Sequence, residues 1–519
     1  MPYDYRPFPY VAPPGLTGPE KQHKVIIVGA GPIGLALAID LAHYGVASVV
    51  LDENNVVSVG SRAICWSKRS LEILDRLGVG ARCVAKGVTW KVGRTFHGSA
   101  EVFNFDLQPE PGHKMPAFVN LQQYYVEQYL VERAMEFSDL IDLRWKNRVT
   151  GIMQGDAVTV TIETPDGSYD LSANWLVACD GANSMVRGLM GLDFAGELFE
   201  ERFLIADIEM TADFPSERWF WFQPAFHPGQ SALLHKQPDN IYRIDLQLGW
   251  DADPEVERQP DRIIPRLQKV VGHGDFRLDW ASIYTFQCRR LARFVQGRVV
   301  FAGDSAHVVS PFGARGGNGG LQDVDALGWR LAALVQGRVG EQVLAAYDRE
   351  RQFGADENIL NSSRTTRFMT PADGAERVFR DAVLHLAGHA AFARPLVNSG
   401  RLSRPCVYPL SGPDAAELPL NARPGTVAPD APFGRGWLCD ALGRQPVLLD
   451  LGVGVPDMPG LKVVAPEVNA EVRSRYLGPA AKALYLIRPD QIIVARWLEF
   501  QTDQIAAALQ QIWGDAEWA

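Results

Sequence analysis

Residues 24–53 read KVIIVGAGPIGLALAIDLAHYGVASVVLDE, and this stretch decides the fold. The β-branched run Lys24–Val28 is typical of a buried strand. A glycine-rich turn follows, and the apolar segment after it predicts a helix that ends at Gly45, a residue suited to a helix C-terminus. A second apolar strand is expected over residues 47–51. Strand, turn, helix and strand in this order predict an α/β, Rossmann-like fold.

The turn has the spacing GxGxxG, formed by Gly29, Gly31 and Gly34. Such glycines let the backbone turn tightly and approach a pyrophosphate, whose charge lies at the N-terminus of the helix. Asp52 ends the second strand and is expected to accept hydrogen bonds from ribose hydroxyls, with Glu53 as the second choice. The pattern predicts a dinucleotide site, and a glycine-rich turn in an unrelated α/β fold is the alternative.

Two later blocks distinguish FAD from NAD, which the first turn alone does not do. Residues 176–181 (LVACDG) are an apolar strand running into Asp-Gly, and residues 299–304 (VVFAGD) are another running into Gly-Asp. The segment 310–323 (SPFGARGGNGGLQD) comes next, and a helix is expected over residues 324–336.

Together the three blocks resemble the class A flavoprotein monooxygenases, the FAD-dependent aromatic hydroxylases. The resemblance covers residues 23–380, and within the family it is greatest to the hydroxyphenylpropionate hydroxylase and phenol hydroxylase branch. It implies bound FAD, NADH or NADPH as co-substrate, O₂, and a flavin C4a-hydroperoxide that hydroxylates a phenolic compound, as in aromatic compound degradation. A hydroperoxide collapses to H₂O₂ in a wet site, so a closed pocket is expected.

The resemblance also implies roles for individual residues. Asp304 would hydrogen-bond the ribityl chain, Asp180 would support the same region, and Pro311 would lie against the reactive edge of the flavin. Backbone amides at a helix start can stabilise negative charge on a reduced flavin. The remaining residues expected to bind the cofactor are Arg62 near the phosphates, Gln123, Gly303, Gly316, Gly317 and Asn318. A solvated helix position is the alternative for Gln123, Arg315 receives no role, and His307 is expected to be structural.

Strands are expected between the second and third blocks, in a sheet over residues 191–289 that would cover the flavin and form the substrate pocket. They are expected at residues 202–210, 219–223, 231–236, 241–248 and 282–288. Alternation along residues 242–247 places Arg243, Asp245 and Gln247 on one face, which is too polar for a plain core. We expect catalytic roles for Arg243, near flavin and substrate, and for His235, as proton partner of the phenol. A half-buried structural histidine is the alternative for His235.

The aromatic run 219–224 (WFWFQP) partly resembles the signature of flavin-dependent halogenases. An aromatic strand that lines a pocket for an aromatic ring explains it equally well. Besides a halogenase, two other classes stay open: a flavin oxidase or reductase that inserts no oxygen, and a non-catalytic FAD sensor. The chain has a single GxGxxG, so no second dinucleotide domain is expected and the nicotinamide site is not located.

Composition bounds the remaining choices. The 519 residues carry a net charge of −10, which disfavours nucleic acid or an anionic membrane as the main partner. Six scattered cysteines form no CxxC pair or zinc-type cluster, so no metal and a cytoplasmic location are expected. No apolar run is long enough to span a bilayer, and no signal peptide is recognised. A homodimer is possible.

Four regions are expected. Residues 1–22, with six prolines, predict an extended arm on the surface, and a disordered tail is the alternative. Residues 23–190 and 290–400 are expected to form the FAD-binding domain, on either side of the inserted sheet. After a proline-rich connector, residues 405–519 resemble the thioredoxin-like C-terminal domain of larger hydroxylases, without CxxC and therefore without redox activity.

Overall fold

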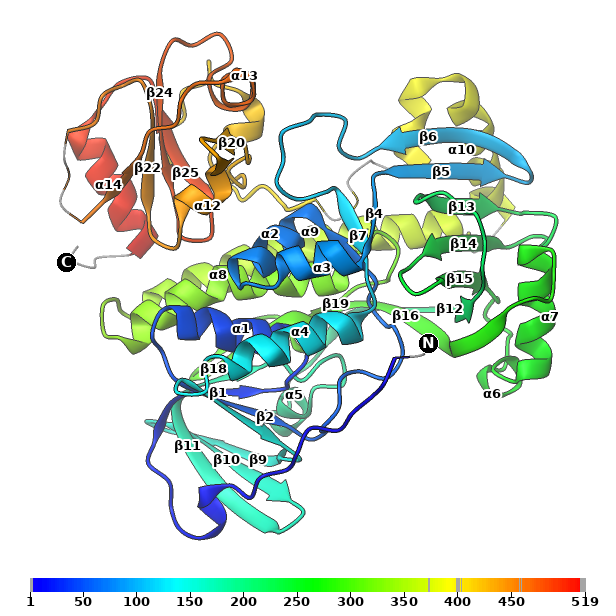
Figure 1. Ribbon diagram of the computed structural model, residues 1–519, viewed down its shortest axis with the longest axis horizontal. Coiled ribbons are helices and arrows are strands. Elements are labelled where there is room, and N and C mark those ends of the chain that lie inside the picture. Colours follow the sequence, from blue (N-terminus) through cyan, green and yellow to red (C-terminus); the bar gives the residue numbers. More distant parts are fainter. Residues whose placement is uncertain are drawn as a thin grey trace.

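The first sheet brings the three sequence blocks to one edge. In the computed structural model, which describes residues 3–371, 374–397, 402, 404–456, 458 and 460–513, this sheet has the order β17-β18-β11-β1-β2-β8, with β10 and β9 continuing from β11. Its strands are β1 (His23–Val28), β2 (Ser48–Asp52), β8 (Ile141–Trp145), β9 (Arg148–Gln154), β10 (Val158–Thr164), β11 (Gly167–Ala178), β17 (Val295–Gln296) and β18 (Val299–Phe301). Because β1 pairs in parallel with β2 and β11, and β11 with β18, the residues after Val28, Leu51, Ala178 and Phe301 lie side by side (Figure 1). The predicted α/β fold is confirmed.

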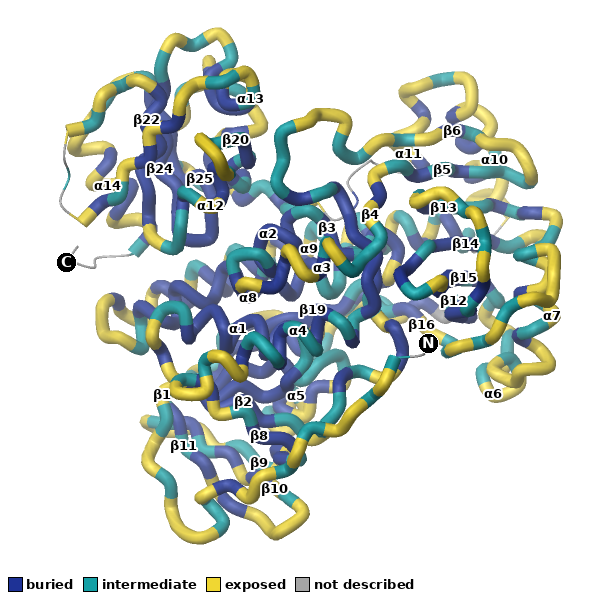
Figure 2. The backbone as a smooth tube through the Cα atoms, in the orientation of Figure 1, coloured by how far each residue is buried: buried dark blue, intermediate teal, exposed yellow. Residues whose placement is uncertain are grey.

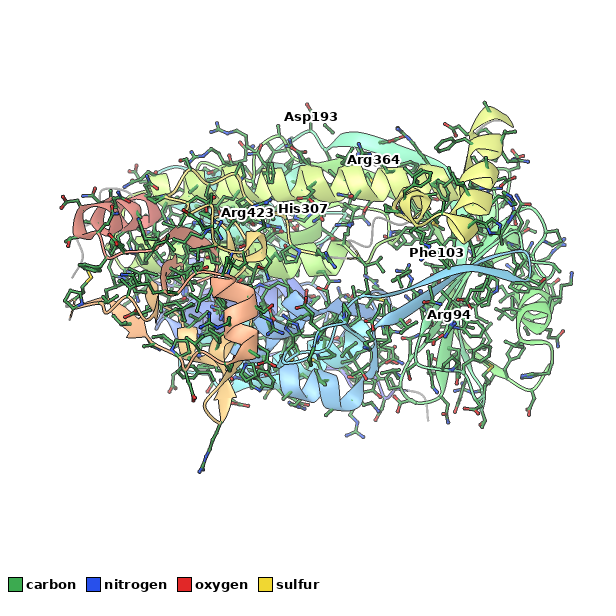
Figure 3. The ribbon with its side chains drawn as sticks, turned by 90° about the horizontal axis from the view of Figure 1, so that it is seen from above. Arg94, Phe103, Asp193, His307, Arg364 and Arg423 are labelled. Atoms are coloured by element: carbon green, nitrogen blue, oxygen red, sulfur yellow. The ribbon has the colours of Figure 1, made fainter. Side chains whose placement is uncertain are left out.

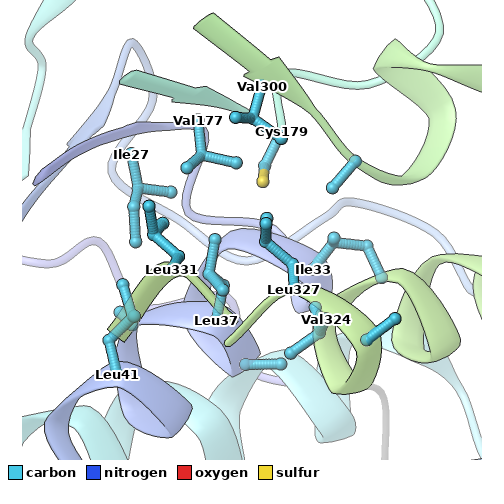
Figure 4. Packing of buried hydrophobic residues seen from close by; sticks show 14 of the residues in the cluster. Ile27, Ile33, Leu37, Leu41, Val177, Cys179, Val300, Val324, Leu327 and Leu331 are labelled. Atoms are coloured by element: carbon cyan, nitrogen blue, oxygen red, sulfur yellow. The ribbon is translucent and has the colours of Figure 1, made fainter. Parts of the chain in front are cut away.

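Two helices cover the face of this sheet next to that edge. Ile33, Leu37 and Leu41 of α1 (Pro32–His43) pack with Val324 and Leu327 of α8 (Gly316–Val335) under the sheet (Figure 4). The helix expected over 324–336 therefore begins eight residues earlier than predicted. Glycine disfavours a helix interior, but a Cβ at Gly320 would lie 2.6 Å from Ile33, so the close approach of the two helices requires glycine there.

A second sheet lies at the right of Figure 1 and has the order β19-β16-β12-β15-β14-β13-β5-β6. Its strands are β5 (Val92–His97), β6 (Ala100–Asp106), β12 (Ala195–Glu209), β13 (Arg218–Phe222), β14 (Ser231–Lys236), β15 (Ile241–Gln247), β16 (Arg277–Arg290) and β19 (His307–Val308). The five strands expected between the second and third blocks are all present. The sheet also takes in β5 and β6 from the range predicted for the FAD-binding domain, because β13 pairs in parallel with β5.

The two faces of the second sheet differ. The outer face carries an apolar cluster that includes Leu234, Ile244 and Leu246 and is covered by Ile263 and Leu267 of α7 (Pro260–Val271). The inner face looks toward a small sheet of β3 (Cys65–Ser67), β7 (Phe118–Asn120) and β4 (Val88–Trp90), as the bond from Asn120 Nδ2 to the Lys236 carbonyl shows (2.9 Å). The other helices around the sheets are α2 (Lys68–Arg76), α3 (Gly80–Lys86), α4 (Gln123–Met135), α5 (Met185–Leu189), α6 (Pro254–Glu257), α9 (Gln342–Met369), α10 (Gly374–His389) and α11 (Arg394–Val397).

The C-terminal region has a sheet of its own with the order β23-β22-β24-β25. Its elements are β22 (Val447–Leu451), β23 (Lys462–Val464), β24 (Ala483–Ile487), β25 (Ile493–Trp497), α12 (Leu438–Leu442), α13 (Ala470–Val472) and α14 (Thr502–Trp513). β22 is parallel to β23 and antiparallel to β24. The thioredoxin-like interpretation stays a prediction, and the domain limits expected at residues 1, 400 and 519 lie outside the described residues.

A buried ionic junction joins this region to α2, α8 and α9 beside the first sheet. The backbones of α2 and α8 are coloured mostly as buried in Figure 2. Arg69 donates to Asp325 Oδ2 (2.6 Å) and to the Asp490 carbonyl (2.7 Å), and Arg76 donates to Asp325 Oδ1 (2.6 Å). Arg488 binds both carboxylate oxygens of Glu350, at 2.7 and 2.9 Å. The five side chains that form these ion pairs are at most 12% exposed, so each charge depends on partners from elsewhere in the sequence. They are Arg69, Arg76, Asp325, Glu350 and Arg488.

The N-terminal residues from Tyr3 onward run along the surface in an extended conformation. Phe8 stacks on Trp145 with ring centroids 4.6 Å apart and exchanges hydrogen bonds with Asn55, at 2.6 and 2.8 Å. The Gly60 amide donates to the Tyr5 hydroxyl (3.1 Å). The arm therefore braces the loop that follows β2.

All six cysteines are free; five are buried and Cys65 is half-buried. Burial raises the pKa of Cys65 to about 11 and that of Cys83 to about 12. The same cause raises the pKa of the other four thiols, Cys179, Cys288, Cys406 and Cys439. In the described ranges no helix is long and apolar enough to cross a membrane, and no group of His, Cys, Asp and Glu could hold a metal ion.

Candidate active site

The glycine turn after β1 has the geometry of a phosphate cradle. Gly29 has φ +104°, and a Cβ there would lie 2.5 Å from the Cys179 carbonyl oxygen. A Cβ at Gly34 would overlap the Gly29 carbonyl, so α1 can start against the strand only with glycine. By contrast, a Cβ at Gly31 would meet nothing within 4 Å. The first and third glycines serve the turn, and the second leaves open space at the helix N-terminus, where a pyrophosphate fits.

The Asp52 carboxylate lies beside this turn. It accepts hydrogen bonds from the Ala30 amide (2.7 Å) and the Asn54 amide (2.8 Å). Burial raises the pKa of Asp52 from its ordinary value, and the two amide donors oppose that shift. Each carboxylate oxygen has a further lone pair, so Asp52 can both hold the turn and accept a ribose hydroxyl.

The loop from Ser58 to Ala63 carries Arg62, whose side chain is exposed and whose φ is +25°. Gln123 holds this loop: its Oε1 accepts from the Ala63 amide (3.2 Å), and its Nε2 donates to Ser58 Oγ (2.9 Å) and Glu127 Oε1 (2.7 Å). The side-chain amide of Gln123 therefore makes its hydrogen bonds within the protein and holds the loop in place. The preceding Gln122, which sequence reasoning did not select, is fully buried with both amide atoms unpartnered among the described residues.

The two acidic residues at the ends of β11 and β18 have different surroundings. Asp180 accepts from Ser184 Oγ (2.6 Å) and the Val186 amide (3.0 Å), and so caps α5. Asp304 follows Gly303 (φ +66°), is exposed, and receives no hydrogen bond from the part of the chain that the structure describes. Surrounding protein still raises its pKa through desolvation, against the attraction of His307 and Arg62. A carboxylate enclosed by protein yet open to solvent is available to a ligand's hydroxyls.

The turn before α8 completes this edge. Pro311 is exposed, and Gly316 and Gly317 open the helix, so their amides point out of its N-terminus. A Cβ at Gly316 would lie 3.9 Å from Asp304 Oδ1, which places the helix start beside that carboxylate. Asn318 uses its side chain otherwise: Nδ2 donates to the Cys65 carbonyl (2.8 Å) and Oδ1 accepts from the Ser67 amide (2.9 Å). Its side chain locks β3 to α8, and only its backbone amide belongs to the helix start.

These residues fit FAD. The open space at Gly31 suits the pyrophosphate, the free Asp304 carboxylate suits the hydroxyls of a ribityl chain, and the α8 N-terminus suits a ring that gains negative charge. The orphaned amide of Gln122 also calls for a hydrogen-bonding ligand. The described residues bring the predicted cofactor positions of all three blocks to one edge of the first sheet.

The inner face of the second sheet faces this cofactor edge. The pairing of β13, β14, β15 and β12 places Arg218, His235, Arg243 and Asp207 in one row across it. Arg243 donates to Asp207 Oδ1 (3.1 Å), to the Arg62 carbonyl (2.6 Å) and to Ser61 Oγ. Arg243 therefore braces the sheet against the Arg62 loop, and its role near flavin and substrate stays a prediction.

His235 is buried, and its Nδ1 lies 3.9 Å from Cys65 Sγ. Burial lowers its pKa well below the ordinary value, and the cations Arg218 and Arg243 lower it further. An imidazole so disfavoured as a cation is a poor proton acceptor. His307 is also buried; its Nε2 lies 2.7 Å from Asp323, which Arg351 binds at 2.6 Å, as expected of a structural residue (Figure 3).

Asp245 lies on the same inner face, two residues from Arg243. Its Oδ1 is buried without a hydrogen-bond partner in the described structure. Its pKa is raised to about 6, mainly by burial and in part by the charge of Asp207, and the cations Arg243 and Arg218 limit the rise. Alternation along β15 placed Asp245 on this face, but its burial and lack of a partner depend on neighbouring strands and were not predicted.

A cavity opens between this face and the end of α9. Its walls are mostly aromatic and apolar, and the described lining residues are Arg94, Thr95, Phe105, Arg218, Phe220, Phe222, Phe312, Gly313, Arg315, Thr365, Phe368, Met369, Val397 and Leu402. Phe220 and Phe222 come from the aromatic run 219–224, whose Trp219 and Trp221 pack on the outer face. Strand alternation therefore accounts for that run, and two of its rings line the pocket. Phe312 and Gly313 follow Pro311 directly, so the cavity adjoins the cofactor edge.

Comparison with known proteins agrees with this geometry. The chain is 30% identical over 495 residues to a flavin-dependent monooxygenase of Mycobacteroides abscessus, covering 90% of this chain and 96% of the relative. It is 27% identical over 454 residues to a 3-(3-hydroxy-phenyl)propionate/3-hydroxycinnamic acid hydroxylase of Mycobacterium avium, covering 84% and 76%. The solved structure of the anhydrotetracycline hydroxylase OxyS from Streptomyces rimosus superposes with a TM-score of 0.74 at 26% identity, covering 96% of this chain and all of that one. The family model described as "FAD binding domain" matches residues 22–362. This chain therefore belongs to the FAD binding domain family, among its flavin-dependent monooxygenases.

Proposed function

We propose that this protein is an FAD-dependent, NAD(P)H-consuming monooxygenase that hydroxylates a phenolic compound. The observation that carries the proposal is the contact between two sites: the turn Pro311–Gly313 belongs to the cofactor edge and also forms a wall of the aromatic cavity. FAD, when bound, supplies the acceptor for hydride from NAD(P)H and the centre that activates O₂. The protein supplies the cofactor contacts, the orientation of the ring and the exclusion of water.

The cavity suits an aromatic substrate. Phe220 and Phe222 stand on the sheet, and Phe312 lies on the turn next to the cofactor edge, so a planar ring can lie against aromatic faces from two elements. Met369 closes the cavity from α9. Such walls hold few waters, which favours transfer of oxygen to the substrate over loss of H₂O₂.

Asp245 is our candidate for the proton acceptor, in place of His235. A phenol becomes a stronger nucleophile at its ring carbons when it loses its proton. With a pKa near 6, Asp245 is ionised at neutral pH and can hold that proton during the reaction. His235 then serves to keep Cys65, Arg218 and Arg243 in place.

The other classes have less support. An oxidase or reductase needs no aromatic cavity beside the flavin, a sensor needs no buried carboxylate with a raised pKa on the facing sheet, and the run 219–224 needs no halogenase explanation. Six free thiols support a reducing compartment, for which we propose the cytoplasm. NAD(P)H, O₂ and the phenol are the proposed partners, and a homodimer is the proposed assembly.

The test follows NAD(P)H oxidation by the FAD holoenzyme at increasing concentrations of phenols, hydroxybenzoates and hydroxyphenylalkanoates, with catalase as control. We expect one class to stimulate oxidation and to yield a product heavier by one oxygen atom, labelled when ¹⁸O₂ is used. Stimulated oxidation that yields only H₂O₂ with every compound would contradict the proposal and favour an oxidase.

A further inference from the structure

The charged side chains that line the aromatic cavity in the described structure are all positive. Arg94, Arg218 and Arg315 line it, and none of the described lining residues is acidic. Arg94 is neutralised from outside the cavity, because it binds Glu217 (2.9 Å) and Glu101 (3.0 Å) (Figure 3). Arg315 donates to Asn358 Oδ1 (3.2 Å).

Arg218 differs from both. Its side chain is only 9% exposed, yet its guanidinium makes no hydrogen bond or ion pair with any residue in the described ranges. It stands at the start of β13, opposite His235 on β14 and Gly93 on β5. Neither neighbour offers a negative charge.

The groups that act on Arg218 do so at a distance. Burial lowers its pKa, and the charge of Asp245 and the thiol of Cys65 oppose this without forming a bond. A buried charge is costly unless it is paired. Since the described protein supplies no bonded partner and the guanidinium borders a cavity, the missing partner belongs to what the cavity binds.

We propose that Arg218 binds a planar oxyanion carried by the aromatic substrate, such as a carboxylate or an ionised enol, and thereby selects anionic ring compounds. The inference rests on the proposed function, which makes this cavity the substrate pocket. A guanidinium offers paired N–H donors that match two oxygens of such a group. With the oxyanion at Arg218, the ring lies along Phe220 and Phe222 and extends toward Phe312, the turn that borders the cofactor edge.

The test measures binding to the oxidised FAD holoenzyme from the change in flavin absorbance, without NAD(P)H. One probe pair is 2-naphthoate and its neutral isostere 2-naphthamide, and the other is 2-hydroxy- and 2-methoxy-1,4-naphthoquinone. We expect the wild-type protein to bind the anion of at least one pair about tenfold or more tightly than the neutral compound, as for a charged hydrogen-bonded pair. The pair that shows the preference tells a carboxylate site from an enolate site.

Three variants assign the preference. Arg218→Met should abolish the anion preference while leaving binding of the neutral probe within about twofold. Arg218→Lys should keep part of the preference, because the positive charge remains but the paired N–H donors of the guanidinium are lost. Arg94→Met is the matched control: it also lines the cavity, but its charge is already paired, so the anion preference should survive. Thermal unfolding and bound FAD are measured for each variant.

Two results would overturn the inference: a wild-type protein without an anion preference for either pair, or a preference that survives Arg218→Met. The second result together with a lowered unfolding temperature would make Arg218 a distant structural counterion of Asp245. The assay is independent of turnover, so an anion preference without oxygen insertion would leave the site standing and refute the proposed function. Hydroxylation of a phenol by a protein without an anion preference would support the proposed function and refute the oxyanion site at Arg218.

Discussion

At the scale of single residues, the site is organised by charges that are buried before any ligand arrives. Arg243 has three partners and holds the Arg62 loop, whereas no residue in the described ranges is bonded to Arg218 or Asp245 on the same face. A side chain that is fully bonded to the protein supports the architecture, and one left unpaired at a cavity is available for ligands. By this measure Arg218 is available to a ligand, and Arg243, Gln123 and Asn318 position the site. Asp245 is unpaired on the same face without being one of the described residues that line the cavity, so its proposed role as proton acceptor needs a separate test.

Asp245→Asn tests this division. Turnover of a phenol by the wild-type protein should rise with pH through about 6, as the carboxylate ionises, and the variant should lose that limb and about 100-fold in kcat. The same change should stabilise the fold. The folded carboxyl has a pKa of about 6 against an ordinary 3.8, so folding is penalised above pH 6, by at most about 3 kcal/mol, and the penalty disappears below pH 4. Unfolding temperatures at pH 8 and pH 4 measure this.

Asp193→Asn is the control for that experiment, because Asp193 is exposed (Figure 3). It should change neither the pH profile nor the unfolding temperature. If the Asp245→Asn variant kept full activity and the same rise of turnover near pH 6, another group would have to accept the phenol proton.

At the scale of elements, the N-terminal arm acts on the cofactor site through one loop. Tyr5→Phe removes the acceptor of the Gly60 amide, and Phe8→Ala removes the stacking on Trp145. Because the loop carries Arg62, we expect FAD dissociation constants to rise by roughly fivefold for each variant, the equivalent of one hydrogen bond. Fluorescence of released FAD measures this, and Val11→Ala, at an exposed arm position, should have no effect. Unchanged FAD affinity in both variants would mean that the arm is only surface covering.

Elements also show where sequence reasoning succeeds and where it ends. Gly29 and Gly34 were predictable because a local turn and a close backbone approach admit no other residue, whereas Gly31 has open space around it and was predicted from the motif spacing alone. The polar face of β15 followed from strand alternation, a local rule. The recruitment of β5 was not predictable, because β13 and β5 are more than 100 residues apart in sequence and pair only in the folded protein. The unpaired state of Arg218 depends on the same long-range pairing and was missed for the same reason.

At the scale of the whole molecule, the ionic junction makes the C-terminal region part of one cooperative structure. Asp325→Ala leaves Arg69 and Arg76 buried without their shared carboxylate, and we expect the free energy of unfolding to fall by about 3–5 kcal/mol. Urea unfolding at neutral pH measures the loss. Glu341→Ala, which removes an exposed partner 3.9 Å from Arg298, should cost less than about 1 kcal/mol. Equal losses in the two variants would contradict the role of the junction.

The buried cysteines bear on how the protein survives its own side reaction. Flavin enzymes that activate O₂ release some H₂O₂ whenever turnover uncouples, and the species that H₂O₂ attacks is the thiolate. Burial raises the pKa of all six thiols, including Cys65 on the strand behind the pocket, so almost no thiolate exists at neutral pH. Oxidative self-inactivation by way of cysteine should therefore be slow, and we expect the protein to withstand peroxide released by uncoupled turnover without a disulfide or a sacrificial sulfur.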